Sequence, residues 1–295
     1  MTSAPTTAPG PEDRALPFPD ATGIRLIASD LDGTLLDELC EVSPRTARAI
    51  TEAAGQGLLV VAATGRQVTQ LPPALRECGV RYAVGSNGAI GVDLGDDEIL
   101  FEELLPARAA ADVVAYLTGR LEGVRFSAVR DHGARHAAEH GYLDLLTPRE
   151  QELWWSHLVP HDLAEVVAEP TLKLTVRHPV LTAEELRIVL EGSGLHGFSA
   201  TTSGAPFLEV QGPGVTKASG VSRLCALLGV EAGEVFAAGD NSNDVELLTW
   251  AGLGVAMGNA VAPALAAADW VTAPNHADGL AEALEHVLSQ ACTPS

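Results

Sequence analysis

The chain has 295 residues, and its 39 Asp and Glu residues outnumber its 18 Lys and Arg residues to give a net charge of −21. A surface of that charge repels nucleic acid and anionic membranes, so we expect neither as a partner. Hydrophobic residues make up 46% of the sequence, which allows a large core, and the length suits one large domain or two smaller ones.

Residues 1–20 are rich in Pro, Thr and Ala and lack a basic start followed by an apolar run. They are predicted to form a disordered tail and not a signal peptide. No apolar run reaches the length of a membrane span. The four cysteines are scattered and form no Cys-x-x-Cys pair, which fits a reducing compartment. We therefore expect a cytoplasmic protein, either a monomer or a homodimer.

The first predicted strand, residues 24–29, is apolar and ends in the sequence Asp30-Leu31-Asp32-Gly33-Thr34. A buried strand that ends in Asp-x-Asp places both carboxylates at its carboxyl end, where open α/β sheets have their active sites. Two carboxylates at so short a distance repel each other unless a cation lies between them or one of them carries a proton. The simplest arrangement is one ionised Asp on a divalent metal and the other Asp protonated. The alternative is an acidic turn in which Asp caps a helix.

A strand–helix–strand pattern follows, with a helix over residues 43–55, a strand over 58–63 and then Thr64-Gly65-Arg66. This pattern predicts a parallel sheet with right-handed crossovers. The end of the second strand would then lie beside Asp30. A hydroxyl and a glycine amide at that place suit phosphate oxygens, although Thr64 fits equally well as a helix cap. A strand over residues 82–84 and a hairpin over 90–104 complete this part.

The character of the sequence changes at residue 105, and we predict an α+β domain, residues 105–205, inserted into an α/β core. Its expected helices and strands cover residues 106–121, 124–130, 171–176, 182–191 and 197–202. Between residues 131 and 168 the chain is rich in His and Arg, but the His spacing matches no metal-ligand pattern. Because inserted domains often cover active sites, Arg130, Arg135 or His136 is expected to contact substrate. The alternative for each is a solvated surface residue.

The core is expected to resume at residue 206 with a strand over 207–210, so that it comprises residues 21–104 and 206–295. Lys217 begins the next predicted helix. A lysine at a helix start opposes the helix dipole, so a functional role is favoured. A later apolar strand, residues 235–238, ends in Gly239-Asp240-Asn241-Ser242-Asn243-Asp244, the second acidic strand end in the chain. Two more strands, residues 253–256 and 270–272, and a helix, residues 280–290, complete the pattern.

Acidic and phosphate-binding residue types thus follow several strands that the sequence places in one sheet. Three acidic groups with oxygen ligands suit Mg²⁺. A lysine and a threonine suit phosphate oxygens. A carboxylate in this setting can act as a covalent nucleophile. The residues of this set are Asp30, Asp32, Thr64, Gly65, Lys217, Asp240, Asn243 and Asp244.

In that order and chemistry the chain resembles the haloacid dehalogenase superfamily. Its four motifs are matched by Asp30-Leu-Asp32-Gly-Thr34, Thr64-Gly-Arg66, Lys217 and Gly239-Asp240-Asn-Ser-Asn243-Asp244. The segments 86–89 and 255–260 further resemble the Cof-type branch. Ala218 departs from that branch, which usually has glycine after the lysine. The resemblance implies a Rossmann-like, doubly wound parallel core with the inserted α+β domain as its cap.

The resemblance also implies a mechanism. Asp30 would attack phosphorus and become an aspartyl phosphate, and Asp32 would protonate the leaving oxygen and then deprotonate a water. Mg²⁺ would be held by the side chains of Asp30 and Asp240 and by the main-chain carbonyl of Asp32. Asp244 would support the metal site or Lys217. The groups expected to hold phosphate oxygens are Thr64, Gly65, Lys217 and Asn243.

The leading interpretation is a Mg²⁺-dependent phosphatase of small phosphorylated metabolites, with sugar phosphates first among them. A phosphatase acting on a flavin-pathway intermediate or on pyridoxal phosphate is a close alternative. A phosphomutase is a weaker one, and a dehalogenase is weaker still because Asp32 suits proton transfer to an alkoxide. A non-catalytic regulatory protein on the same fold is a different class, and the complete set of acids argues against it.

Overall fold

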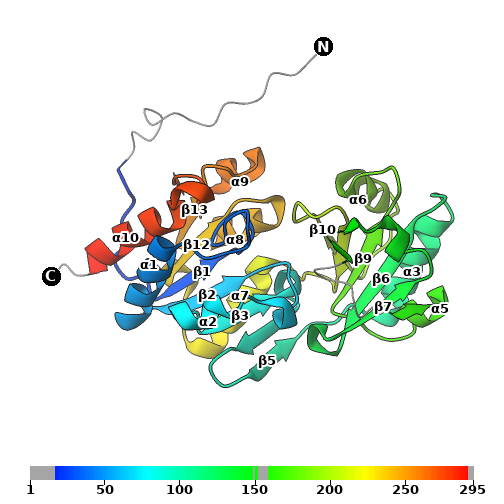
Figure 1. Ribbon diagram of the computed structural model, residues 1–295, viewed down its shortest axis with the longest axis horizontal. Helices are drawn as coiled ribbons and strands as arrows, with labels where there is room; N and C mark the ends of the chain where they lie inside the picture. The colour runs from blue at the N-terminus through cyan, green and yellow to red at the C-terminus, as the bar shows by residue number, and fades with distance from the viewer. Residues whose placement is uncertain (1–16, 149, 152–158, 292–295) are drawn as a thin grey trace, which may run out of the picture.

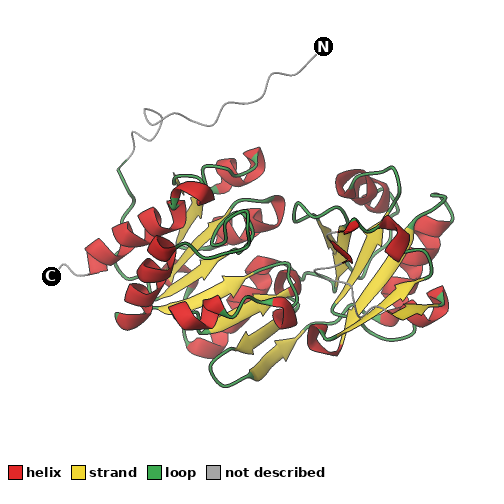
Figure 2. Ribbon diagram, in the orientation of Figure 1, coloured by secondary structure: helices red, strands yellow, loops and turns green. Residues whose placement is uncertain are grey.

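The computed structural model describes residues 17–148, 150–151 and 159–291. In these residues the chain forms two sheets, each with helices against it, in two halves that face each other (Figures 1 and 2). The predicted α/β core with an inserted α+β domain is confirmed. Most of the predicted tail, residues 1–16, lies outside the described residues.

The larger sheet has eight strands in the order β14-β13-β12-β1-β2-β3-β4-β5. The first six strands of that order are parallel, and β4 and β5 extend the sheet as an antiparallel hairpin. The strands are β1 (Leu26–Ser29), β2 (Leu59–Ala63), β3 (Tyr82–Gly85), β4 (Ile90–Asp93), β5 (Glu98–Glu102), β12 (Val235–Gly239), β13 (Leu253–Ala256) and β14 (Trp270–Val271).

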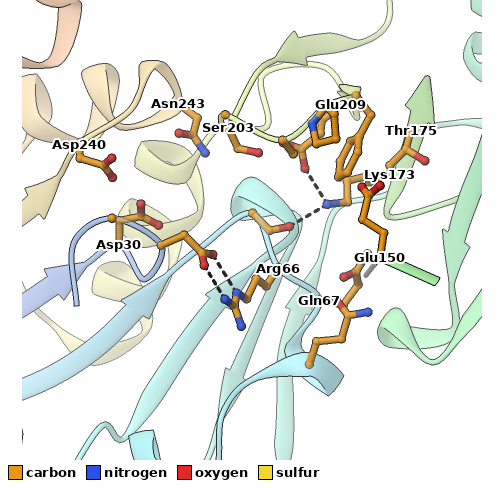
Figure 3. A pocket seen from close by; sticks show the side chains of 18 residues that line it. Asp30, Arg66, Gln67, Glu150, Lys173, Thr175, Ser203, Glu209, Asp240 and Asn243 are labelled. Atoms are coloured by element: carbon orange, nitrogen blue, oxygen red, sulfur yellow. Dashed lines mark hydrogen bonds and ion pairs between the residues drawn. The ribbon is translucent and has the colours of Figure 1, made fainter. Parts of the chain in front are cut away.

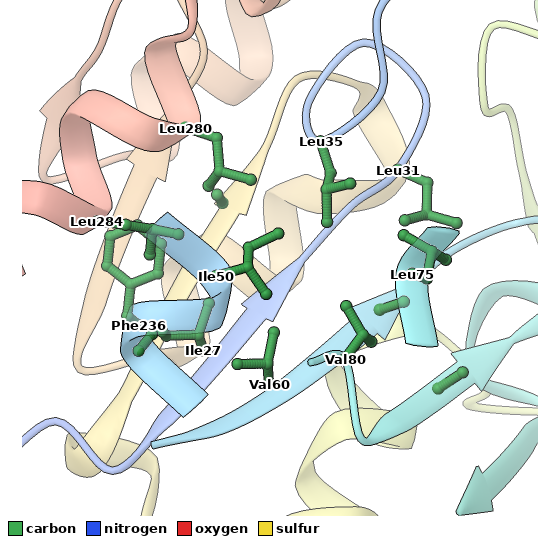
Figure 4. Packing of buried hydrophobic residues seen from close by; sticks show 14 of the residues in the cluster. Ile27, Leu31, Leu35, Ile50, Val60, Leu75, Val80, Phe236, Leu280 and Leu284 are labelled. Carbon is green, nitrogen blue, oxygen red and sulfur yellow. The ribbon is translucent and has the colours of Figure 1, made fainter. Parts of the chain in front are cut away.

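Helices cover both faces of this sheet, as expected for a doubly wound fold. On one face, Ile27, Val60 and Phe236 of the strands pack with Ile50 and with Leu280 of the helices (Figure 4). On the other face, neighbouring strand residues such as Leu26 and Ala28 pack into a separate cluster. The first face carries α1 (Pro44–Gly55), α2 (Ala74–Cys78) and α10 (Gly279–Ala291), and the second carries α7 (Lys217–Leu228), α8 (Val245–Trp250) and α9 (Ala262–Ala267).

The smaller sheet has six strands in the order β10-β11-β9-β6-β7-β8 and is antiparallel except between β7 and β8. It consists of β6 (Arg125–Arg130), β7 (Arg135–Glu139), β8 (Val159–His161), β9 (Lys173–Arg177), β10 (Ser199–Thr201) and β11 (Leu208–Gln211). Apolar residues on one face pack against α3 (Ala107–Thr118), α5 (Leu163–Val166) and α6 (Ala183–Glu191). On the opposite face, Lys173, Thr175 and Glu209 lie toward residues of the larger sheet's half.

One predicted strand belongs to the other half of the molecule. Residues 207–210 were predicted to belong to the core, but β11 pairs with β9 and β10 in the smaller sheet. Its local pattern predicts a strand correctly and carries no information about which sheet it joins. In addition, β7, β8 and α5 lie in a segment for which no elements were predicted. We therefore propose residues 105–211 as the extent of the cap.

Candidate active site

The candidate active site lies where β1 and β12 end, at the point where the chain changes from one side of the sheet to the other (Figure 1). The two strands are parallel neighbours, and the Asp30 amide donates to the carbonyl of Ala238 at 2.9 Å. Asp30 and Asp240, the residues after each strand, are thereby brought together. A Cβ at Gly33 would collide with the Asp240 carboxylate, and the φ of Gly33 is +81°, so this turn requires glycine.

Lys217 joins two carboxylates of this site. Its Nζ lies 2.7 Å from Oδ1 of Asp30 and 2.6 Å from Oδ1 of Asp244, and all three side chains are buried. Lys217 is the first residue of α7, where Thr216 caps the helix by accepting from the amide of Ser219 at 3.2 Å. A cation is unfavourable at a helix start, and the two carboxylates supply the charge that compensates for it.

Burial and mutual repulsion raise the pKa values of the acids. Burial, together with the Asp244 charge, raises the pKa of Asp30 well above its usual range, although Lys217 opposes the shift. The same two causes raise the pKa of Asp240 from 3.8 to about 6. Burial alone would lower the pKa of Lys217, but Asp244 and Asp30 raise it instead. The site therefore has a shortage of positive charge, even with the lysine present.

The arrangement of oxygens fits a hard divalent cation. Carboxylate oxygens of Asp30, Asp240 and Asp244 all lie within 4.8 Å of one another. Both oxygens of Asp244 already have partners, because Oδ1 accepts from Lys217 and Oδ2 accepts from the amides of Asp240 and Asn241 at 3.1 and 2.9 Å. Asp30 and Asp240 thus keep oxygens for a cation. The side chain of Asp32 lies outside this cluster, and only its main-chain carbonyl was expected to bind metal.

Asp32 points instead to the opening of the site, where it forms an ion pair with Arg66. Nε of Arg66 donates to Oδ2 of Asp32 at 2.8 Å, and a second guanidinium nitrogen donates to Oδ1. The Asp32 side chain is 52% exposed, so water and substrate can reach it. Arg66 belongs to the second motif, but the sequence predicted no role for it. A bidentate partner fixes the direction of the Asp32 carboxylate.

Of the residues expected to bind phosphate, Gly65 and Asn243 line one cavity together with Asp30, and Lys217 contacts Asp30 directly. Thr64 is buried after β2, and its hydroxyl accepts from the Arg66 amide at 3.1 Å. Nδ2 of Asn243 donates to Oδ1 of Asn87 at 2.9 Å. A Cβ at Gly88 would collide with the backbone of Thr216, the residue before α7, which explains why glycine follows Asn87 and how this turn comes so close to the start of α7.

A cavity of about 540 Å³ opens above these residues and is lined by both halves of the molecule (Figure 3). Its volume suits a small metabolite. The core contributes Asp30, Asp32, Gly33, Gly65, Arg66, Gln67, Gln70, Asp240 and Asn243. The cap contributes Glu150, Lys173, Thr175, Ser203, Gly204, Ala205, Pro206, Phe207 and Glu209.

The three cap residues expected to contact substrate do not line this cavity. The guanidinium of Arg130 is buried and donates to the carbonyls of Glu165 and Val166, at 3.1 and 2.7 Å. Arg135 forms ion pairs with Asp131 and Glu169. Burial, followed by the nearby Lys173 charge, lowers the pKa of His136 to about 4. Since none of the three lines the cavity, the structure gives the prediction no support, and the contacts of Arg130 and Arg135 described above are with the cap itself.

Lys173 and Glu209 were not among the predicted site residues, although the sequence contains a signal for both. Lys173 and Lys217 are the only two lysines in the chain, and both are buried at this site. On β9 and β11, polar residues alternate with the apolar residues Leu174, Val176, Leu208 and Val210, which pack inside the cap. A lysine and a glutamate on the opposite face of two strands would be unusual without a partner or a ligand.

Comparison with known proteins identifies the family. A profile of haloacid dehalogenase-like hydrolases matches residues 27–284, so the chain belongs to this family, as its motifs predicted. The 5-amino-6-(5-phospho-D-ribitylamino)uracil phosphatase of Escherichia coli strain K12 is 30% identical over 268 residues, which cover 90% of this chain and 96% of that protein. A phosphoglycolate phosphatase of Methanoculleus marisnigri is 26% identical over 264 residues and covers 89% of this chain and 96% of that protein.

Solved structures agree with this assignment. A haloacid dehalogenase-like hydrolase from Bacteroides thetaiotaomicron matches with a TM-score of 0.70 and 28% identity, covering 90% of this chain and 99% of that chain. A sugar phosphatase of subclass IIB has the same fold, with a TM-score of 0.75 at 24% identity and coverage of 89% and 98%. The chain is accordingly a phosphatase enzyme of this family. Within the described ranges, no helix has the length and apolar character to cross a membrane.

Proposed function

We propose that this chain is a cytoplasmic, Mg²⁺-dependent phosphatase of small phosphorylated metabolites, with sugar phosphates as the leading class, and that it acts through an aspartyl phosphate on Asp30. The observation that carries the proposal is the position of Asp30 at the base of an open cavity, beside Asp240. Lys217 fixes its carboxylate, with 2.7 Å between Nζ of Lys217 and Oδ1 of Asp30. A cation at this place would offset the repulsion that the net charge of −21 exerts on a phosphate.

In the proposed reaction, an oxygen of Asp30 forms a bond to phosphorus while the bond from phosphorus to the ester oxygen breaks. Asp32 in its protonated form gives its proton to that leaving oxygen. Asp32 then takes a proton from a water, whose oxygen attacks the phosphoaspartate, releases orthophosphate and restores Asp30. A Mg²⁺ ion held by Asp30, Asp240 and the Asp32 carbonyl would neutralise charge on the phosphoryl group.

The remaining polar groups would hold the phosphoryl oxygens. Lys217 supplies an ammonium beside Asp30, and Thr64, Gly65 and Asn243 supply a hydroxyl, an amide and a carboxamide. Lys217 is fixed by Asp30 and Asp244, and Asn243 is fixed by Asn87, so these donors are in place before substrate binds. Such preorganisation is the condition for electrostatic stabilisation of a transition state. Arg66 pairs with the ionised form of Asp32 and, as a positioning residue, would hold this carboxylate for the step in which it takes a proton from water.

A second candidate substrate class is a flavin-pathway intermediate. The E. coli relative is named as a phosphatase of a phosphoribitylaminouracil, and it covers 90% of this chain. Its named substrate carries a phosphorylated ribityl chain, so it shares a polyol phosphate end with sugar phosphates.

The proposal is tested by measuring hydrolysis of an aryl phosphate with and without Mg²⁺, and then of a panel of phosphorylated metabolites. Mass spectrometry of the acid-quenched enzyme should detect one phosphate on the peptide that contains Asp30. A folded protein that hydrolyses none of these esters would contradict the proposed function. Size-exclusion chromatography with light scattering would distinguish between the two expected states, a monomer and a homodimer.

Replacing Lys217 with alanine is expected to lower kcat/KM roughly 10²-fold or more, by analogy with the loss of one preorganised charge-stabilising donor. The replacement leaves two buried carboxylates without the ammonium that lies 2.7 and 2.6 Å from them. Steady-state kinetics on the aryl phosphate provide the measurement, and thermal unfolding shows whether the variant is folded. A loss of less than a few-fold would show that Lys217 does not act on the phosphoryl group.

Mg²⁺ is expected to stabilise the protein more at high pH than at low pH. Folding raises the pKa of Asp240 from 3.8 to about 6, so ionisation of this group destabilises the metal-free fold as the pH rises through that range. The cation binds the ionised form. The rise in Tm caused by Mg²⁺ should therefore be larger at about pH 8 than at about pH 5. Equal shifts at both pH values, or the same shifts in Asp240→Asn, would contradict this expectation.

A further inference from the structure

A buried ion pair lies in the wall of the cavity opposite the catalytic acids. Nζ of Lys173 on β9 lies 2.6 Å from Oε1 of Glu209 on β11, and the two side chains are 3% and 1% exposed. The same Nζ donates to the carbonyl of Gly65 at 2.7 Å. The cap thus contacts the core through this pair at the loop that follows Thr64 (Figure 3).

The pair faces the cavity and not the apolar interior of the cap. Lys173, Thr175 and Glu209 line the cavity together with Asp30, whereas Leu174 and Val210 pack among the cap helices. A Cβ at Gly65 would lie 3.5 Å from Oε1 of Glu209, so the carboxylate sits directly against the loop of the second motif. A substrate whose phosphate lies near Thr64 and Gly65 would bring its next atoms close to Glu209.

One carboxylate oxygen of this pair is left without a hydrogen-bond donor among the described residues. Oε2 of Glu209 is buried and accepts no hydrogen bond from the described residues. A buried acceptor without a donor destabilises a protein, and a buried ion pair is often no more stable than apolar residues of the same size. Fold stability is therefore a weak reason for Lys173 and Glu209 at these positions, whereas a donor supplied by a bound molecule would satisfy Oε2.

We propose that Glu209, held in place by Lys173, determines substrate specificity by accepting a hydrogen bond from a hydroxyl group of the substrate near its phosphoester. This inference rests on the proposed phosphatase function and defines its substrate class as phosphate esters of neutral polyols and sugars. The pair of Lys173 and Glu209 has no net charge, but the oxygen that faces a substrate, Oε2, belongs to the negatively charged carboxylate of Glu209. A second phosphate or a carboxylate on the substrate at this position would be repelled, so anionic esters such as phosphoglycolate are excluded.

The test compares Glu209→Gln and the double variant Lys173→Met/Glu209→Leu with the full-length parent protein. The substrates are glycerol phosphate, ribitol phosphate and sorbitol phosphate, with propyl phosphate as the ester that has no hydroxyl and phosphoglycolate as the anionic ester. The double variant replaces the pair by apolar side chains, a change that folds tolerate better than one unpaired charge. Thermal unfolding verifies that each variant is folded.

Glu139→Gln provides a matched control. Glu139 is also a buried carboxylate of the cap sheet, and its Oε1 accepts no hydrogen bond within the part of the chain that the structure describes. It lies beside a cation, with 3.6 Å between this oxygen and Nε of Arg125. It lies on β7 and does not line the cavity. This variant should keep the substrate preferences of the parent.

The parent should prefer its best polyol phosphate to propyl phosphate, and the double variant should reduce this ratio of kcat/KM values roughly 10- to 100-fold, the effect of losing a hydrogen bond to a charged group. Glu209→Gln should also reduce the discrimination against phosphoglycolate. An equal loss on every ester, no change in the ratios, or a parent without preference for hydroxylated esters would overturn the inference. If the folded parent hydrolyses no ester at all, the proposed function itself fails, which is a distinguishable result.

Discussion

Asp30→Asn is expected to abolish turnover, with a loss on the order of 10⁴-fold or more in kcat, while the fold is retained. Asparagine is nearly isosteric with aspartate, but its amide cannot form the acyl phosphate and binds a cation poorly. The buried site should tolerate the change because burial and Asp244 disfavour the ionised form of Asp30 and raise its pKa. Without metal, the variant should therefore unfold at the same temperature as the parent or at a higher one.

The measurement is kcat on the aryl phosphate, with mass spectrometry to confirm that no phosphoenzyme forms. Asp112→Asn is a suitable control, because Asp112 lies on α3 of the cap and its side chain is 53% exposed. That variant should retain parental activity and stability. Comparable turnover by a folded Asp30→Asn protein would refute the covalent mechanism, whatever the substrate.

Removal of divalent metal is expected to abolish activity completely, and added Mg²⁺ should restore it. The physical reason is the group of oxygens from Asp30, Asp240 and Asp244, which lie within 4.8 Å of one another with one buried lysine as compensating charge. A phosphoryl group would add further negative charge to this site. Activity is measured after exhaustive dialysis against a chelator and again after stepwise addition of metal.

Ca²⁺ should not restore turnover and should inhibit when Mg²⁺ is present. Its coordination shell is larger and more variable than the octahedral shell of Mg²⁺, so it would displace the phosphoryl group from the line of attack by Asp30. Full activity after exhaustive chelation would refute the metal assignment. Strong turnover supported by Ca²⁺ would refute only the geometric part of the argument.

The sequence predicted which acids and which lysine meet at this edge of the sheet because each part of the edge is a local pattern. An apolar run followed by an acid gives both the strand and the position at its end, as with Asp30 after β1 and Asp240 after β12. Parallel pairing then brings such ends together without further information. Lys217 was identified for a similar reason, because a lysine at the start of α7 conflicts with the helix dipole.

The cap side of the cavity could not be predicted in the same way. Lys173 and Glu209 meet because β9 and β11 pair with Val210 opposite Leu174, and this register between segments 36 residues apart is not a local property. Arg130 was predicted to contact substrate because it lies at the edge of a basic segment. In the structure its guanidinium donates hydrogen bonds to two carbonyls of α5 instead. A charged side chain in the cap can bind either substrate or the protein backbone. Which of the two it does depends on how the strands pair, and the local sequence does not determine that pairing.

The distribution of cations has a consequence for chemical modification of the protein. With lysine confined to positions 173 and 217, both buried, the outer surface carries no side-chain amine, and its positive charges come from arginine and histidine. Acylating reagents, aldehyde crosslinkers and enzymatic acetylation thus have no lysine target on the exterior. Slow amine labelling, apart from that of the chain terminus, would report on the opening of the space between cap and core.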